Sequence, residues 1–171
     1  ATLFPDRVGQ FVLDGAIDPT VSDEEQTLIQ LQAFENSLRA FLEECEQFTD
    51  CPFTGSVESD LNTISQFFLS LEDDPLPTAS GRELTIWAAV TGLIMPLYSE
   101  SFWSFLATAF DQALNEKRGD LFLVLADQYN DRNEDGKYGT NLIAANFAIN
   151  CVDARSSTNI FSMKRQNAAL L

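Results

Sequence analysis

Apolar side chains recur at steps of three and four residues along most of this chain, which is the spacing of one face of an α-helix. The pattern predicts a first helix over about 22–48, which would be roughly 40 Å long at the usual rise per residue. We expect its apolar positions to be buried, and these are Leu28, Leu31, Phe34, Leu38, Phe41, Leu42, Cys45 and Phe48. The fold class is therefore mostly α.

Five further helices follow from the same spacing. The second begins after Ser56, the third covers about 82–95, and the fourth runs from Phe105 to Leu114. Gly119 favours a helix end there, and Asp120 can cap the fifth helix. The sixth covers about 139–150.

Serines stand at three of the predicted helix starts. Ser22 with Glu25, and Ser80 with Glu83, have the spacing of a capping box, in which each side chain bonds the backbone N–H of the other residue. Ser56 can cap the second helix by itself.

The third predicted helix is apolar on nearly every side. Such a helix is normally buried on several sides. Pro96 follows it directly and should end or kink it, because proline lacks the N–H that continues the helical ladder.

One short segment near the start is predicted to be a strand. Phe11, Val12 and Leu13 form an apolar run bounded by Gly9 and by Asp14, which is typical of a strand buried on both faces. One strand cannot make a sheet. Either the domain uses it as an isolated extended segment, or the rest of the sheet lies outside this chain.

The charge and composition exclude several classes of function. The formal net charge is −16, which repels nucleic acid phosphates and anionic membranes, so neither is an expected partner. No apolar run approaches the roughly 20 residues of a membrane span. The chain has no histidine, so it cannot supply a Ser-His-Asp triad or most catalytic zinc sites by itself.

Two motifs at the start carry a resemblance to a known family. Phe-Pro-Asp-Arg-Val-Gly at 4–9 and Val-Leu-Asp-Gly-Ala-x-Asp-Pro at 12–19 resemble the segment after the nucleophile elbow of α/β-hydrolases. More narrowly, they are similar to tripeptidyl-aminopeptidase-like exopeptidases of the proline-iminopeptidase group. The resemblance implies a multi-helix cap or lid domain, preceded by one short strand of the hydrolase sheet. The catalytic Ser, Asp and His would lie outside this chain.

The resemblance also implies a domain organisation and a role. Residues 1–20 would be the end of a core segment, 21–155 the helical cap, and 156–171 the start of the return to the core. The cap would gate the active site of a secreted or cell-surface bacterial serine exopeptidase that cleaves short peptides from N-termini. Its partners would be a peptide substrate and the hydrolase core of the same chain, with no cofactor. Taken alone, the fragment should be inactive, and the edges of its unpaired strand should promote self-association.

The three cysteines suggest one disulfide-bonded pair and one cysteine that is unpaired within this chain. Cys45 and Cys51 stand in a Cys-x5-Cys-Pro pattern that the resemblance includes, which implies a disulfide between them. Two ordinary thiols are the alternative. Cys151 would be unpaired here, as the family has a further cysteine downstream. Oxidised cysteines imply an exported protein.

The resemblance places six residues near the substrate. Buried carboxylates could pair with the ammonium group of a peptide, and the candidates are Asp14, Asp18 and Asp153. For the first two, turn formation is the alternative, and for Asp153 it is a helix-terminus or loop carboxylate. Tyr-Ser-x-x-x-Trp at 98–103 makes Tyr98 and Trp103 candidates to line the cleft, with core aromatics as the alternative. Ala-Ile-x-Cys-x-Asp at 148–153 adds Asn150.

One loop matches the first half of a calcium-binding motif. Asp131, Asn133, Asp135 and Gly136 have the EF-hand spacing, but the twelfth position is Leu142 in place of the bidentate glutamate. A polar turn between helices without a metal is the better interpretation, and a weak, exposed calcium site is the alternative.

A second hypothesis for the whole chain is a free-standing helical binding module without catalysis. The missing histidine favours it, and helices over 22–150 could bury a core by themselves. A lone strand at the N-terminus argues against it.

Overall fold

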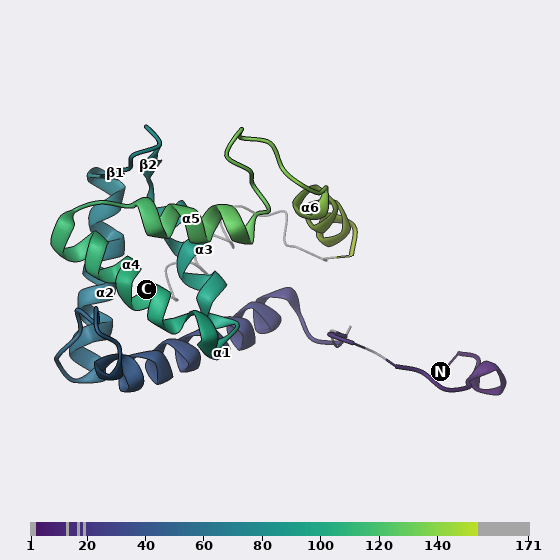
Figure 1. Cartoon of the computed structure of the whole chain (residues 1–171). Coiled ribbons are helices and arrows are strands. Elements are labelled where there is room, and N and C mark those ends of the chain that lie inside the picture. Colours follow the sequence, from purple (N-terminus) through teal and green to yellow (C-terminus); the bar gives the residue numbers. More distant parts are fainter. Residues whose placement is uncertain (1–2, 13, 17, 19, 154–171) are drawn as a thin grey trace. The chain divides into compact units, whose positions relative to one another are not determined.

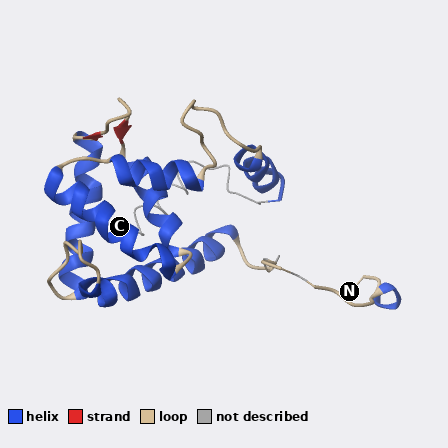
Figure 2. Ribbon diagram, viewed as in Figure 1, coloured by secondary structure: helices blue, strands red, loops and turns tan. Residues whose placement is uncertain are grey.

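The computed structural model describes residues 3–153 except 13, 17 and 19, and this part of the chain is mostly helical (Figures 1 and 2). Its α-helices are α1 (Asp23–Glu44), α2 (Val57–Asp73), α3 (Ile86–Leu97), α4 (Trp103–Asp111), α5 (Asp120–Tyr129) and α6 (Leu142–Asp153). Two short strands, β1 (Leu76–Pro77) and β2 (Glu83–Leu84), pair antiparallel. The predicted mostly-α class is confirmed.

The chain divides into two compact units, Ala1–Leu28 with Arg155–Leu171, and Ile29–Ala154. In the first unit, the described residues include a single 3-10 turn at Pro5–Arg7 and the first turns of α1. Phe11 and Val12 of the predicted strand are exposed and are in no strand, and Leu13 lies outside the described residues. The predicted domain boundaries at 20 and 155 stay a prediction.

Aromatic rings fill the core of the second unit. Phe110 of α4 is fully buried, and its ring centroid lies 5.0 Å from those of Phe53 and Phe122. The rings of Phe41 and Phe67 lie 6.2 and 6.3 Å away. Most of these pairs meet edge to face, the arrangement that aromatic quadrupoles favour. Phenylalanine has no polar atom to satisfy, so this core can be dense and dry.

Helices α3 and α5 lie side by side and run in the same direction. Leu84, just before α3, touches Gly119, just before α5, and Tyr98 at the end of α3 stacks on Tyr129 at the end of α5. Between them, Gly92 faces the backbone of Phe122 so closely that a Cβ atom there would lie 2.4 Å from its carbonyl oxygen. The missing side chain is what allows this approach.

Two of the three serine caps are confirmed. The Ser22 hydroxyl accepts a hydrogen bond from the backbone N–H of Glu25 at 3.2 Å, and the Ser56 hydroxyl accepts one from that of Ser59 at 3.3 Å. Both sequences place a short oxygen-bearing side chain directly before an apolar helical stripe, which is a local signal.

The predicted cap at Ser80 and Glu83 is wrong. Glu83 belongs to β2, and α3 begins later, with Thr85 as its N-cap accepting from the backbone N–H of Ala88. The physical reason is the pairing of Leu84 with Leu76, which buries both side chains against the core and takes this segment out of the helix. Ser80 instead lies in the turn between the strands and accepts from the N–H of Arg82.

Burial along the predicted stripe of α1 departs from the prediction, whereas that of α3 follows it. Leu28 and Leu31 are 44% and 50% exposed, whereas Leu38, Phe41, Leu42 and Cys45 are buried and Phe48 is half-buried. The periodic pattern is present along the whole helix, but only its second half lies against other described helices. In α3, Trp87 is 78% exposed, but every other residue from 86 to 97 is buried or half-buried, which agrees with the prediction of a helix buried on several sides. Pro96 is buried inside its last turn, which ends one residue later.

The sixth helix starts and ends about three residues later than predicted, at Leu142 and Asp153. Its described side chains are exposed or half-buried, including the apolar Leu142, Phe147, Ile149 and Val152. Among the described residues, no helix is both long enough and apolar enough to cross a membrane.

Candidate functional site

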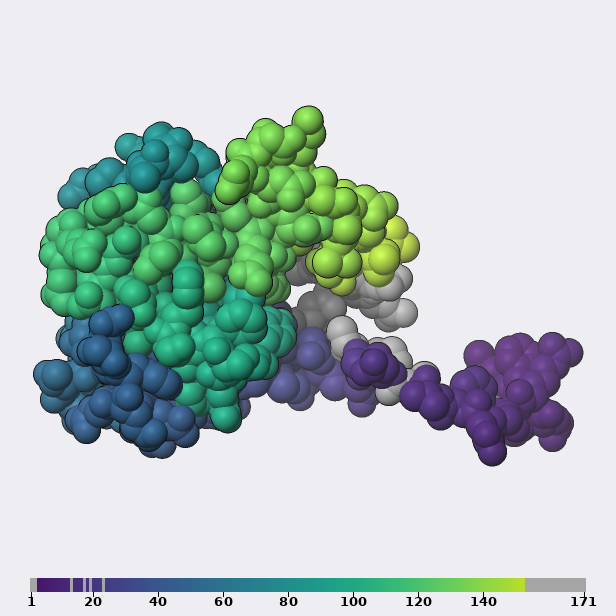
Figure 3. All heavy atoms as spheres, viewed as in Figure 1, coloured from purple at the N-terminus to yellow at the C-terminus, as the bar shows by residue number. Residues whose placement is uncertain are grey.

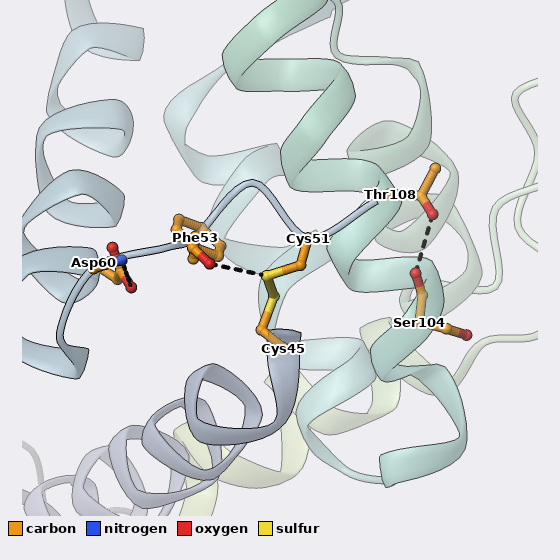
Figure 4. The surroundings of a disulfide bond; sticks show 7 residues. Cys45, Cys51, Phe53, Asp60, Ser104 and Thr108 are labelled. Atoms are coloured by element: carbon orange, nitrogen blue, oxygen red, sulfur yellow. Dashed lines mark hydrogen bonds between the residues drawn. A yellow bond between two sulfur atoms is a disulfide. The ribbon is translucent and has the colours of Figure 1, made fainter. Parts of the chain in front are cut away.

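A disulfide joins the end of the first helix to the loop that follows it. Cys45 opens a 3-10 turn directly after α1, and its sulfur is bonded to that of Cys51, with the two Cα atoms 5.5 Å apart (Figure 4). The predicted disulfide is confirmed. Cys45 is buried, and the Cys51 sulfur lies 3.3 Å from the carbonyl oxygen of Phe53. Cys151 is an exposed free thiol in α6.

Polar contacts hold the disulfide loop in place on both sides. Thr108 of α4 donates its hydroxyl to the Asp50 carboxylate at 3.2 Å, and a pocket of about 220 Å³ opens beside this contact. Beyond the loop, the buried Asp60 carboxylate accepts the backbone N–H of Gly55 at 3.2 Å. The loop is therefore positioned against α2 and α4 as well as closed by its covalent bond.

Reducing this disulfide should lower the free energy of unfolding by about 2 kcal/mol, because a cross-link over so short a loop restricts the unfolded chain only modestly. Urea unfolding with and without a reductant measures the difference. Cys151→Ser is the matched control, since it removes the free thiol and should show the same loss on reduction. Equal midpoints in both redox states would contradict the prediction.

Three aromatic side chains form a partly exposed cluster, here called the aromatic patch and made of Phe34, Tyr98 and Tyr129. The rings of Phe34 and Tyr98 meet edge to face at 5.4 Å, and those of Tyr98 and Tyr129 stack at 6.4 Å. Tyr98 is 63% exposed and Tyr129 is 39% exposed. Burial raises the pKa of the Tyr129 phenol, and the neighbouring Tyr98 adds to this shift. Such a surface offers flat apolar faces together with hydroxyl groups.

Trp103, the other aromatic candidate, lies in the core. Its side chain is 4% exposed, and its ring meets that of Phe41 edge to face at 6.1 Å. The indole Nε1–H has no hydrogen-bond acceptor among the described residues. Its position agrees with the alternative interpretation as a core aromatic, whereas Tyr98 lies at the surface.

Of the polar candidates, Asp14 and Asp18 belong to the first unit and Asn150 to the second. The Asp18 carboxylate accepts hydrogen bonds from the backbone N–H and the hydroxyl of Thr20, at 2.8 and 2.7 Å. Both bonds lower the pKa of Asp18, and the one from the backbone N–H contributes most. This is the turn-forming arrangement that the sequence offered as the alternative. Asp14 is exposed in a bend.

In α6, the Asn150 amide donates to Asn146 at 3.0 Å, and the side chain of Asp153 lies outside the described residues. Within the unit Ile29–Ala154, no hydrogen bond or ring contact joins any two of Tyr98, Trp103 and Asn150, the predicted substrate residues whose side chains are described there. Their role in binding a substrate stays a prediction.

The segment with half of an EF-hand pattern forms a closed polar turn. Its ends pair through a β-bridge between Arg132 and Tyr138, and the backbone N–H of Asn133 donates to the Lys137 carbonyl at 2.8 Å. The Asp135 carboxylate accepts the N–H of Lys137, which lowers its pKa. Across the described residues, no group of three or more carboxylate or thiol side chains is placed to hold a metal ion.

A groove of about 450 Å³ lies between the β1–β2 turn, α5 and this polar turn, and the sequence analysis missed it. In the space-filling view, the residues of the β1–β2 turn lie directly against those of α5 (Figure 3). The Asp127 carboxylate of α5 accepts hydrogen bonds from both terminal nitrogens of the Arg82 guanidinium, at N–O distances of 2.5 and 3.0 Å. The Arg132 guanidinium lies 3.6 Å from the same carboxylate. Arg82 and Asp127 are 45 residues apart, so no local motif signals their pairing.

Comparison with known proteins relates the chain to hydrolases. No protein-family model matches it. It is 33% identical over 157 residues to the proteins named serine protease Hip1 of Mycobacterium tuberculosis and Mycobacterium bovis, an alignment that covers 88% of this chain and 30% of each relative. It is 35% identical over 152 residues to carboxylesterase B of Mycobacterium tuberculosis, covering 88% of this chain and 29% of that protein.

The chain therefore spans about 30% of the length of the curated relatives it matches. The predicted relationship to hydrolases is confirmed at this level, because these relatives are named as a serine protease and a carboxylesterase. Neither name specifies an aminopeptidase or a cap domain, so both of those assignments stay predictions.

Proposed function

We propose, from the similarity to longer proteins named as hydrolases, that this chain is the substrate-gating helical cap of a secreted serine exopeptidase that removes short peptides from N-termini. The observation that carries the proposal is the pair of coverages, 88% of this chain against 30% of the relative. A segment that aligns over most of its length, yet with under a third of a hydrolase, is expected to be one part of a larger enzyme.

The composition supports placing the chemistry outside this segment. A serine hydrolase needs a base to take the proton of its nucleophile, and a chain without histidine lacks the usual one. In the proposed enzyme, serine attacks the carbonyl carbon, histidine moves the proton, aspartate orients the histidine, and backbone N–H groups stabilise the oxyanion. All three triad residues would belong to a core domain that this chain joins through residues 1–20 and 156–171, with 21–155 as the cap.

The aromatic patch gives the proposed cap a surface for substrate. Tyr98 and Tyr129 present exposed ring faces, on which the apolar side chains of a short peptide could pack. Asp14, Asp18 and Asp153 are the proposed partners of its N-terminal ammonium group, and Asn150 and Trp103 are the other proposed substrate residues. Helices over the mouth of an active site would exclude long chains by their bulk, which is what an exopeptidase requires.

The confirmed disulfide supports the proposed extracellular location. Disulfides form and persist in oxidising compartments and are rare in the cytosol. We also propose the hydrolase core as the main protein partner of this chain.

Two experiments test this function. The first determines the coding sequence on both sides of this segment, where a Gly-x-Ser-x-Gly motif upstream and Asp and His codons downstream are expected. The second assays the isolated chain with a peptide anilide and a carboxyl ester, and we expect no turnover of either. Turnover that a serine-directed inhibitor abolishes would overturn the proposal.

A free-standing helical binding module is the second candidate. The observation that favours it is the buried core of the unit Ile29–Ala154, which is continuous from Leu38 to Leu125. A start codon directly before Ala1 and a stop codon after Leu171 would favour this module over the enzyme.

A further inference from the structure

The groove beside α5 has an apolar wall and a polar rim. Leu123 is buried at its base, and Val124 is 53% exposed along its side. The polar rim comes from three different segments: Ser80 and Arg82 in the β1–β2 turn, Asp127 in α5, and Arg132 in the polar turn. A site that combines an apolar wall with a few convergent polar groups is typical of small-molecule binding.

Most of the carboxylate oxygens buried in the groove already have partners. Both oxygens of Asp127 accept from Arg82, and the backbone N–H of Ala79 donates to the Asp120 carboxylate at 2.6 Å. The other oxygen of Asp120 is buried without a hydrogen bond among the described residues, and the Arg118 guanidinium balances its charge from 2.9 Å away. Asp127, the acid closest to Arg132, therefore has little capacity left for a further donor.

The donor groups are not occupied to the same extent. A guanidinium carries five N–H groups, and the one ion pair of the Arg132 guanidinium within the described chain is with the Asp127 oxygen at 3.6 Å, while Asp135 interacts with it only through its charge. Its side chain is 24% exposed, so it is largely withdrawn from water as well. Arg132 thus leaves unfilled the hydrogen-bonding capacity of a positively charged donor, which matches a carboxylate.

The charge around the groove agrees with this choice. The lining has Arg82 and Arg132 against the acids Asp120, Asp127 and Glu134, a formal charge of −1 in a chain of net charge −16. Arg118, which does not line the groove, offsets this charge through its ion pair with Asp120. An anion meets less repulsion here than over the average of the surface. Glu134 is exposed at the rim, where water solvates its charge.

We propose that this groove binds the carboxylate of a small ligand that carries an aliphatic or aromatic group beside it, such as the free C-terminus of a peptide or an N-acylated amino acid. The carboxylate pairs with Arg132, and the neighbouring side chain packs on Leu123 and Val124. The site is built entirely within the unit Ile29–Ala154, so it holds whether the chain is a cap or a free-standing module.

The experiment titrates the whole chain with N-acetyl-leucine and follows the methyl signals of Leu123 and Val124 by NMR. N-acetyl-leucinamide is the matched probe, because it differs only in lacking the carboxylate charge. We expect the amide to bind at least about tenfold more weakly, which is the usual contribution of a charge-assisted hydrogen bond. Leucinamide, a cation, should not bind.

Two variants test the residues. Arg132→Gln should weaken N-acetyl-leucine binding about tenfold, and Val124→Asp should weaken it similarly while leaving every ion pair of the groove in place. Arg39→Gln is the control, since Arg39 is also partly buried and ion-paired but belongs to α1. It should bind the ligand as the parent chain does, and far-ultraviolet circular dichroism should show all three variants folded.

Several outcomes would overturn the proposal. These are no signal change at the highest soluble ligand concentration, equal binding of the amide, tighter binding of leucinamide, or unchanged affinity of the Arg132→Gln variant. Equal affinity for inorganic phosphate, which has no side chain to pack on Val124, would overturn the role of the apolar wall. None of these results bears on the proposed exopeptidase, whose test lies in the flanking gene sequence.

Discussion

Replacing Phe110 by alanine should lower the free energy of unfolding by about 3–5 kcal/mol, the usual cost of truncating a buried phenylalanine. The residue is fully buried, and its ring touches those of Phe41, Phe53, Phe67 and Phe122. These rings come from α1, the segment just after the disulfide loop, α2 and α5, so the cavity would lie where four segments meet. Rigid rings around it cannot easily collapse into the space, which places the loss toward the upper end of the range.

Denaturant unfolding monitored by circular dichroism measures this loss. Phe105→Ala is the matched control, because Phe105 belongs to the same helix and is 36% exposed. Its truncation should cost no more than about two thirds as much, since burial of apolar area sets the scale of both effects. A loss below about 1.5 kcal/mol for Phe110→Ala would show that the core is not packed as described.

Replacing Gly92 by alanine should also destabilise the fold, by about 3 kcal/mol, although alanine is the better helix former. The propensity gain is about 1 kcal/mol, but the new Cβ atom would lie 2.4 Å from the carbonyl oxygen of Phe122. Since the obstacle is backbone, no side-chain rotation relieves the overlap, and α5 as a whole must move away from α3. The destabilisation from this overpacking exceeds the stabilisation from the higher helix propensity of alanine.

The control for this variant is Gly9→Ala, at a glycine where the added methyl group would have nothing within 4 Å. It should leave the midpoint of urea unfolding unchanged within error. Gly92→Ala should instead shift the midpoint strongly and loosen the Tyr98–Tyr129 stack at the far end of the same helix pair. A more stable Gly92→Ala variant would mean that α3 and α5 are further apart than the structure has them.

Local signals were enough to predict most helices and two of their caps. Ser22 and Ser56 each cap a helix through residues of that helix alone, and both caps form as predicted. Ser80 has the same local pattern but does not cap a helix, because Leu84 pairs with Leu76 in a strand instead. These two residues are eight positions apart, so the local pattern around Ser80 does not predict their pairing. The exposure of Leu28 likewise could not be predicted, because periodicity identifies an apolar face without saying what covers it.

The candidate sites divide in the same way. The Cys45–Cys51 bond lies within one loop, and its pattern was visible in the sequence through a resemblance. The groove depends on Arg82 meeting Asp127, and the aromatic patch on Phe34 meeting Tyr98, contacts that only the packing of α1, α3 and α5 creates. Such sites are formed by tertiary structure, so no local sequence motif predicts them.

The two tryptophans of this chain lie in opposite environments, and this gives the protein a built-in pair of optical reporters. Trp87 is 78% exposed and should emit at long wavelength and be quenched by iodide, whereas Trp103 is 4% exposed and should emit at short wavelength, protected from the quencher. Loss of the protected emission of Trp103 therefore reports unfolding of the core. Shielding of the exposed indole instead signals that another surface has covered the start of α3, so one fluorescence titration separates docking from unfolding.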